Sequence, residues 1–245
     1  MPTRPKLIYL AERSAALTRE QFTQRWRRHF ELARSRPRWR HVSRYIQCDV
    51  LTELAQELGT PDIYEGSASV WYRSVEAHAQ SVAETSSQRV MEADEVEVFS
   101  RLVRNFAVLT EERVLRGAGD GQAKLHLFLR RAPDVPEAIF RQRLVDVHAP
   151  LLLADQTLRR YVQSIPIKPE AERQAGLPFD LVEELWFDGI EQLAASCRRI
   201  IAHSALRQNL RQIAHDWVLL PTNENVLYRD ERTDGPYSAG KSSMQ

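Results

Sequence analysis

The chain has 245 residues, which is enough for one large domain or for two domains of about 100–120 residues each. Hydrophobic residues make up 43% of the chain and charged residues 27%, proportions that are typical of a soluble globular protein. The formal net charge of +1 argues against a molecule built as a whole around a polyanion such as nucleic acid.

One stretch is nevertheless rich in arginine. It contains Arg25, Arg27, Arg28, Arg34, Arg36, Arg38, Arg40 and Arg44. We interpret this run as a solvated helix face and the loop after it, with a site for an anionic or phosphate-bearing ligand as the alternative. Nucleic-acid binding is disfavoured, because few aromatic residues are interleaved with the arginines.

The two cysteines, Cys48 and Cys197, show no zinc-ligand spacing, and we expect them to be free and buried. The N-terminus lacks the pattern of a secretory leader, and the longest apolar runs are too short to span a membrane. These features predict a reduced, cytoplasmic location.

The first half begins with a short apolar strand at residues 6–13. A helix follows, because Thr18 as N-cap and Gln21 three residues later form a capping box. The apolar face of this helix comprises Phe22, Trp26, His29 and Phe30. After it the sequence predicts a strand at 44–47, a loop at 59–62, a strand at 68–72, a broken helical region at 75–102 and a strand at 106–109.

The second half repeats this order, starting with a strand at 124–131. Asp134 is the predicted N-cap of its first helix, and Pro150 predicts that this helix ends at His148. The apolar stripe comprises Phe140, Leu144, Val147 and His148. After it come a strand at 160–163, a loop at 176–180, a strand at 183–187, a broken helical region at 189–214 and a strand at 217–220.

Equivalent positions, such as Lys6 and Lys124 or Tyr45 and Tyr161, are about 116–119 residues apart, which indicates an internal duplication. The predicted domains are a first repeat at 1–116, a Gly-rich linker at 117–122, a second repeat at 123–228 and a polar tail at 229–245.

Each repeat has the order βαββαβ, which predicts an α+β fold of two ferredoxin-like units. One unit leaves a sheet face uncovered, and two units can bury these faces against each other. We therefore expect an intramolecular dimeric α/β barrel, a pseudo-dimer within one chain, and leave open a further homodimer.

The pattern of Thr18, Phe22, Trp26 and His29, then Arg44-Tyr45-Ile46-Gln47, then Trp71-Tyr72 and the segment Ala93-Asp94 to Phe99, resembles the EthD family of the dimeric α/β-barrel superfamily. The resemblance covers about residues 5–115 and 123–222. In the second half the Trp26 position is aliphatic, and the Asp94 segment has no clear equivalent. We therefore expect the first half to keep the more complete site.

His29 and His148 are the strongest candidates for catalytic residues. A histidine at a helix end can have a pKa near neutrality, where it could transfer a proton. The alternative is a structural histidine bonded to a carbonyl. The resemblance implies that this histidine faces a cavity.

The other candidates are aromatic or acidic. Tyr45 is a candidate catalytic residue and Tyr161 a substrate-binding one, since a phenol can hydrogen-bond a carbonyl, or each can be a packed aromatic. Trp71 and Trp186 belong to the sheet core or stack on a ligand. Asp94 orients His29 or caps a helix. Phe22 and Trp26 complete the expected substrate-binding set.

The chain contains no dinucleotide-binding, P-loop or nucleophile-elbow motif, and its remaining histidines share no metal-ligand spacing. We therefore expect no metal and no cofactor, with haem as an exception, because some relatives in the barrel superfamily hold it through a histidine.

The leading hypothesis is a cofactor-independent, lyase-like enzyme that acts on a hydrophobic aromatic or polyketide-like carbonyl compound. Dehydration, cyclisation or isomerisation would proceed by histidine acid/base catalysis, as the resemblance implies. The alternatives are a cofactor-free phenol monooxygenase and a protein that binds a hydrophobic ligand without chemistry.

Overall fold

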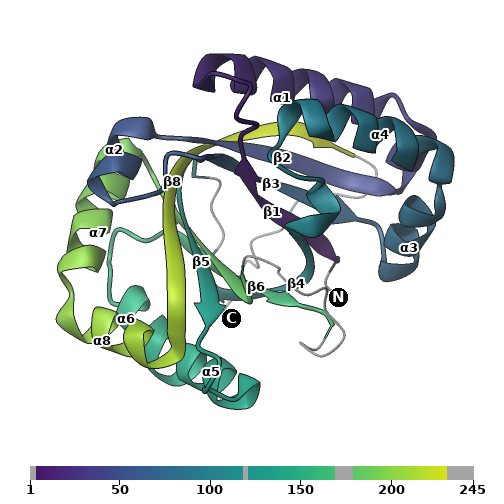
Figure 1. Cartoon of the computed structure of the whole chain (residues 1–245). Coiled ribbons are helices and arrows are strands. Elements are labelled where there is room, and N and C mark those ends of the chain that lie inside the picture. Colours follow the sequence, from purple (N-terminus) through teal and green to yellow (C-terminus); the bar gives the residue numbers. More distant parts are fainter. Residues whose placement is uncertain (1–3, 118–120, 169–178, 231–245) are drawn as a thin grey trace, which may run out of the picture.

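A computed structural model describes residues 4–117, 121–168 and 179–230. Across these segments eight antiparallel strands form a closed barrel, and the helices lie outside it (Figure 1). The strands are β1 (Lys6–Glu12), β2 (Val42–Val50), β3 (Tyr64–Tyr72), β4 (Ala107–Arg116), β5 (Ala123–Arg131), β6 (Arg160–Pro166), β7 (Leu181–Phe187) and β8 (Ala214–Arg229). The protein is therefore a mixed α+β barrel.

The strands follow the order β1-β3-β2-β8-β5-β7-β6-β4, and β4 pairs with β1 to close the barrel. Within the first half the neighbours run β4-β1-β3-β2, and within the second they run β8-β5-β7-β6. The strand pairs β2–β8 and β4–β6 join the two halves. The same neighbour order therefore occurs twice along the chain.

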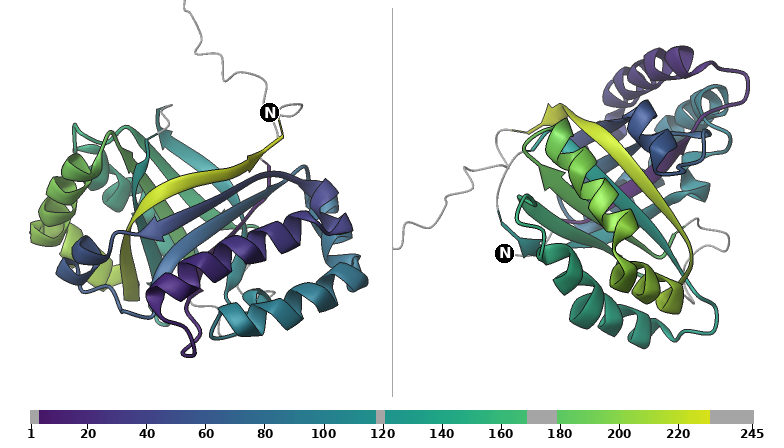
Figure 2. Two further views of the ribbon diagram at one scale, coloured as in Figure 1. Left: turned by 90° about the horizontal axis from the view of Figure 1, so that it is seen from above. Right: turned by 90° about the vertical axis from the view of Figure 1, so that its left-hand side faces the viewer.

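The helices form one group over each half, as Figure 2 shows. They are α1 (Arg19–Arg34), α2 (Thr52–Glu57), α3 (Val75–Ala83), α4 (Thr85–Val98), α5 (Glu137–Arg143), α6 (Ala149–Leu153), α7 (Ile190–Ala202) and α8 (Ser204–Ile213), with 3₁₀ turns at Pro37–His41 and Val103–Asn105. α1 packs beside α4, and α7 contacts β5 and β7. No helix of the described segments is long and apolar enough to cross a membrane.

The start of α1 confirms the predicted capping box. The Thr18 hydroxyl accepts from the backbone N–H of Gln21, and the Gln21 side chain accepts from the backbone N–H of Thr18. The buried face of α1 is Phe22, Trp26, His29 and Phe30, as the spacing predicts. Both predicted breaks in the later helical regions are also confirmed, because α3 and α4 meet at Glu84 and α7 and α8 meet at His203.

The first helix of the second half differs from the prediction. α5 starts after Pro136, so Asp134 is not its N-cap. The helix also does not end at His148, since a π-helical turn at Leu144–His148 continues into α6. Pro150 is tolerated because it lies in the first turn of α6, where the missing N–H has no intrahelical partner. β8 is also much longer than the predicted strand at 217–220.

The predicted connections lie partly outside the described residues, which exclude 118–120, 169–178 and 231–245. Within the predicted linker, Gly117 has a φ of +50°, and a Cβ on Gly121 would lie 2.5 Å from the carbonyl oxygen of Phe187. Both positions therefore require glycine. α2, which follows β2, was not predicted.

Alternation along each strand sends one set of side chains towards the helices and the other into the barrel. An apolar zone inside the barrel contains Ile8, Leu10, Val108, Phe128, Phe179, Val182 and Leu220. A charged zone contains Lys6, Glu112, Lys124, Glu184 and Glu224. The predicted site residues are divided between these inner positions and the helix-facing ones.

Candidate functional site

His29 lies between α1 and α4. Its Nδ1 is 2.7 Å from Oδ2 of Asp94, which also pairs with Arg25. Burial acts to raise the pKa of Asp94, but the hydrogen bonds from His29 and Arg25 hold that pKa below its usual value. An ionised Asp94 only accepts, so the proton on Nδ1 of His29 is fixed. Asp94 lies within α4, not at its cap, and its carboxylate is bonded to His29.

Tyr45 faces the same helices from β2. Its hydroxyl accepts from Nε2 of Gln47 at 2.9 Å and lies 3.4 Å from the hydroxyl of Tyr9. Nε1 of Trp26 donates to the Tyr9 hydroxyl at 3.1 Å. Burial raises the pKa of both tyrosines, so they stay neutral and can donate hydrogen bonds.

Aromatic side chains fill the space around this group. Phe22 lies 5.4 Å from Trp26 between ring centroids, and the His29 ring packs edge-on against Phe99 at 5.4 Å. Phe30 stacks on Tyr45 at 5.0 Å. Only 7% of the His29 side chain is exposed. The first-half site is therefore a packed aromatic cluster in which the histidine is almost fully buried.

The second half places His148 against a different carboxylate. Nε2 of His148 is 2.8 Å from Oε2 of Glu183 on β7, and Nδ1 is 3.3 Å from Oδ1 of Asn209 on α8. The side chains of His148 and Glu183 are fully buried. Both ring nitrogens are engaged, so His148 offers no free lone pair to a ligand.

Tyr161 belongs to the same group. Its hydroxyl donates to Oε1 of Glu183, and Nε2 of Gln163 donates to that oxygen at 2.9 Å. Burial acts to raise the pKa of Glu183, but the adjacent His148 and these hydrogen bonds lower it overall. Burial and the Glu183 carboxylate raise the pKa of Tyr161 well above its usual value. The group is a closed polar network, with Tyr161 as a neutral donor.

Trp71 and Trp186 lie away from both histidines, because alternation turns them into the barrel. Nε1 of Trp71 donates to Glu112 at 3.2 Å, and Nε1 of Trp186 donates to Glu224 at 3.0 Å. The structure therefore does not bring the two tryptophans together with the histidine, tyrosine and aspartate candidates.

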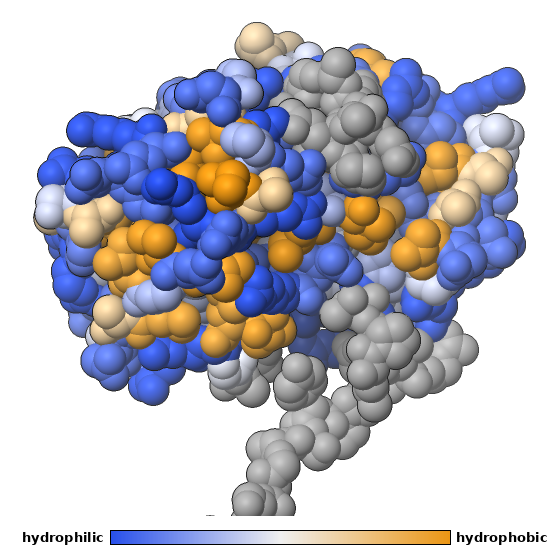
Figure 3. Space-filling model, turned by 90° about the horizontal axis from the view of Figure 1, so that it is seen from below, coloured by the Kyte–Doolittle hydropathy of each residue, from blue (hydrophilic) through white to orange (hydrophobic). Residues whose placement is uncertain are grey.

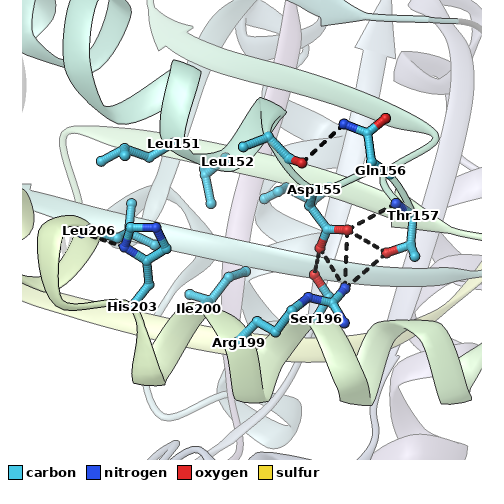
Figure 4. A pocket seen from close by; sticks show the side chains of 12 residues that line it. Leu151, Leu152, Asp155, Gln156, Thr157, Ser196, Arg199, Ile200, His203 and Leu206 are labelled. Carbon is cyan, nitrogen blue, oxygen red and sulfur yellow. Dashed lines mark hydrogen bonds and ion pairs between the residues drawn. The ribbon is translucent and has the colours of Figure 1, made fainter.

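A cavity of about 370 Å³ lies in the second half (Figure 4). It lies between α6, the loop after α6, β7, α7 and α8. Its lining comprises Leu151, Leu152, Ala154, Asp155, Gln156, Thr157, Leu185, Ser196, Arg199, Ile200, His203 and Leu206. Figure 3 shows apolar residues gathered on the side of the molecule that carries the second-half helices, where Ile139 and Val147 are exposed.

One end of the cavity is polar. Asp155 accepts from the hydroxyl of Ser196, from both the backbone N–H and the hydroxyl of Thr157, and from Arg199 at 2.9 Å. Burial acts to raise the pKa of Asp155, but these hydrogen bonds lower it to about 2. Asp155 is therefore ionised, and it holds Arg199 at the cavity wall.

The cavity lies beside the His148 network without reaching it. Leu152 follows His148 by one helical turn, Leu206 precedes Asn209 by three residues, and Leu185 is two residues from Glu183 on the same face of β7. A row of leucines, Leu152, Leu185 and Leu206, therefore forms the wall between the cavity and the polar network.

The EthD domain model matches residues 14–102 and 132–206, more than half of the chain. The chain belongs to the EthD family. The family inferred from the sequence is thus confirmed, and the match includes both histidine-bearing segments. No curated protein sequence matches this EthD protein.

Solved structures of low identity share the fold. An anthrone oxidase-like protein aligns with a TM-score of 0.60 and 11% identity over 91% of this chain and 93% of its own. A putative monooxygenase of Fusobacterium nucleatum aligns with a TM-score of 0.52 and 8% identity over 93% and 94%. A putative chlorite dismutase gives 0.50 and 10% over 91% and 95%. At these identities the likeness concerns the barrel fold alone.

Neither His148 nor His203 offers haem an axial ligand at the second-half cavity. An axial ligand needs an imidazole nitrogen with a free lone pair. Both nitrogens of His148 are engaged. His203 lines the cavity, but its Nδ1 accepts from the backbone N–H of Leu206, so its Nε2 carries the proton when the ring is neutral. Within the described residues, no cluster of three or more histidine, cysteine or acidic side chains could hold a metal ion.

Sequence reasoning missed Glu183, Asn209 and Tyr9. Glu183 was predicted only as part of a strand. A carboxylate at a helix-facing strand position is costly to bury unless it is paired. Asn209 contacts His148 from α8 as Asp94 contacts His29 from α4, so the Asp94 position does have a counterpart. The expectation that the first half keeps the more complete site stays a prediction, and the cavity lies in the second half.

Proposed function

We propose that this EthD protein binds a hydrophobic small molecule in the second-half cavity. The observation that carries the proposal is the cavity itself, about 370 Å³ with largely apolar walls and a polar end at Asp155. Sites for small organic ligands have this size and composition, with a few polar groups that fix the ligand's orientation. The leucine row would contact the apolar body of the ligand.

The polar groups of the cavity indicate which chemical groups the ligand carries besides its apolar body. Arg199 is half-exposed and held by Asp155, so its remaining N–H groups can donate to a ligand oxygen. The Nε2–H of a neutral His203 is a second donor at the cavity wall. A ring system that carries a carbonyl, phenol or carboxylate oxygen would place its rings against the leucines and its oxygen near these donors. Anthrone, the tricyclic ketone in the name of the anthrone oxidase-like structure, belongs to this class.

The test is titration with 1-anilinonaphthalene-8-sulfonate, a fluorescent apolar anion. Ala154 lies at the exposed edge of the cavity, and Ala154→Trp places an indole across it. Ala205→Trp adds the same bulk to an exposed position of α8 that does not line the cavity. The proposal predicts saturable binding that Ala154→Trp abolishes and Ala205→Trp preserves. Equal binding by both variants would place the probe elsewhere.

A second candidate function is acid/base catalysis on a carbonyl compound. The hydrogen bonding of His29 supports this candidate. Its Nδ1 is fixed by Asp94, and within residues 4–117, 121–168 and 179–230 no hydrogen bond occupies its Nε2. Nε2 could take a proton from the carbon next to a carbonyl, the electron pair passing to the carbonyl oxygen as an enolate. Tyr45, kept neutral by burial, would donate to that oxygen. Dehydration, cyclisation or isomerisation all begin this way.

Replacing His29 with alanine should reduce the rate about a hundredfold or more if this candidate is right. An unchanged rate would remove His29 from the mechanism. Oxygen consumption with candidate phenols would indicate a cofactor-free monooxygenase instead. Saturable binding without turnover, unaffected by substitution of either His29 or His148, would leave ligand binding alone.

We also propose that the two halves are ferredoxin-like repeats, an intramolecular counterpart of a dimeric α/β barrel. The shared strand order in the two halves supports this. So do the hydrogen bonds that each half forms between its histidine and a residue of its last helix.

A further inference from the structure

The strand directions bring basic and aromatic side chains to one end of the barrel. β1, β2, β5 and β6 start at this end, and their antiparallel neighbours finish there. We name this end the lower mouth and define it by Arg44, Trp71, Arg160, Trp186 and Arg229. It is separate from the cavity between α6 and α8.

Each half contributes the same stacked pair to the lower mouth. The guanidinium carbon of Arg44 lies 5.0 Å from the ring centroid of Trp71, and that of Arg160 lies 4.6 Å from Trp186. β2 and β6 are four positions apart in the ring of eight strands, so the two pairs stand on opposite walls. The indole faces stabilise the guanidinium groups and orient them.

The carboxylates of the barrel interior already have cationic partners. Glu112 accepts from Lys6 at 2.7 Å, and Glu224 lies 2.5 Å from Lys124. Glu184 contacts both lysines. Each of Glu112 and Glu224 also accepts from the indole nitrogen of its own half. The contacts of these carboxylates in the described structure are thus mainly with the lysines and the indoles.

Within the described residues, Arg44 and Arg160 have few polar partners. Arg44 reaches only a long ion pair with Glu224 at 3.7 Å. The Nε atoms of Arg44 and Arg160 are buried and have no hydrogen-bond partner within the described structure. Arg229 is the cross-strand partner of Arg44, and like charges placed opposite each other are destabilising. Burial, together with the charges of Arg160 and Arg229, lowers the pKa of Arg44.

Space for a ligand lies at the part of the lower mouth formed by β8 and the start of β5. A cavity of about 290 Å³ opens at the lower mouth, lined by Gly121, Gln122, Glu224, Val226 and Arg229. Lys6, Lys124, Arg44 and Arg160 carry four positive charges against the three carboxylates, so positive charge is in excess even without Arg229.

We infer that the lower mouth binds a small oxyanion, a carboxylate or phosphate group, against Arg44 and Arg160. The guanidinium fork matches the geometry of either group and binds it through two parallel hydrogen bonds. A bound oxyanion would supply acceptors near the two Nε atoms that have no partner within the described structure.

The experiment is thermal unfolding of the full chain in titrations of inorganic phosphate and, separately, of acetate, at constant ionic strength set with sodium chloride. A ligand that binds only the folded state raises the melting temperature, and the stabilisation grows with the logarithm of its concentration above Kd. The variants are Arg44→Gln and Arg160→Gln, with Arg28→Gln as the control, since Arg28 is an exposed residue of α1.

We expect one or both anions to stabilise the wild type and the Arg28→Gln variant. Arg44→Gln and Arg160→Gln should each weaken the apparent affinity about tenfold or more. The anion that binds more tightly identifies the group as phosphate or carboxylate. If either glutamine variant fails to fold by circular dichroism, Arg44→Lys or Arg160→Lys replaces it, keeping the charge but not the fork. No stabilisation beyond chloride, or equal stabilisation of all variants, overturns the inference.

Discussion

Glu184 is the buried carboxylate that contacts both lysines inside the barrel. Its side chain is fully buried, and its carboxylate contacts Lys6, Lys124 at 3.2 Å and the hydroxyl of Ser164 at 3.0 Å. Burial acts to raise the pKa of Glu184, but the two lysines lower it well below the usual value. The Glu184→Gln substitution keeps the shape and removes the charge, leaving two buried ammonium groups with two carboxylates.

Removing one partner of a buried ion pair costs about 3–5 kcal/mol. Glu112 and Glu224 still pair with the lysines, so we expect the lower end, about 3 kcal/mol. For a chain of this size each kcal/mol lowers the melting temperature by about 2–4 °C, which gives a drop of roughly 6–12 °C.

The assay is thermal and urea unfolding followed by far-ultraviolet circular dichroism. Glu57→Gln is the matched control, because Glu57 pairs with Arg198 on the exposed surface, and its loss should barely change stability. If Glu184→Gln unfolded at the same temperature as Glu57→Gln, or higher, the account of the charged zone would be wrong.

Three further experiments test the packing and the polar networks. Gly66→Ala should destabilise the fold by about 1–3 kcal/mol in urea unfolding, because the new Cβ would lie 2.2 Å from the carbonyl oxygen of Cys48. The pKa of Asp155 is lowered from 3.8 to about 2 in the folded state, so its ionised form stabilises the fold above pH 3.8, and this stabilisation is lost as the pH falls towards about 2. Asp155→Asn should therefore remove this part of the pH dependence of the unfolding free energy. An unchanged pH dependence in the variant would contradict the assignment. A double-mutant cycle of His148→Ala and Glu183→Ala should give a coupling energy of about 0.5–3 kcal/mol, and additive effects would mean that the two side chains do not interact.

The fold could be predicted largely from local signals. The Thr18 capping box, the apolar face of α1 and the strand pattern are properties of short segments, and the structure confirms them. The π-turn at Leu144–His148 could not be predicted, because it depends on how the helix packs rather than on residue preference. Pro150 has no local signal that distinguishes a helix end from the first turn of a new helix.

The candidate site was predicted less completely, because its members meet only in three dimensions. His29 and Asp94 were both named, yet their 2.7 Å contact depends on how α4 packs on α1. Glu183 was not predicted as a site residue, because an acidic residue in a strand usually faces solvent. Trp71 and Trp186 were among the predicted substrate-binding residues, as were aromatic residues near His29. The prediction did not say which face of the sheet each strand residue occupies, and a shift of one residue along a strand moves a side chain to the opposite face.

The cavity had no sequence signal at all. Its lining comes from α6, the loop after it, β7, α7 and α8, and each of these residues is ordinary for its own element.

The most direct test of the ligand site is a crystal structure of the protein grown with 1-anilinonaphthalene-8-sulfonate at a concentration that saturates binding in solution. We expect density for the probe between α6 and α8, with its rings against Leu152, Leu185 and Leu206 and its sulfonate beside Arg199. Density between α1 and α4, or at another surface with the second-half cavity unoccupied, would contradict it.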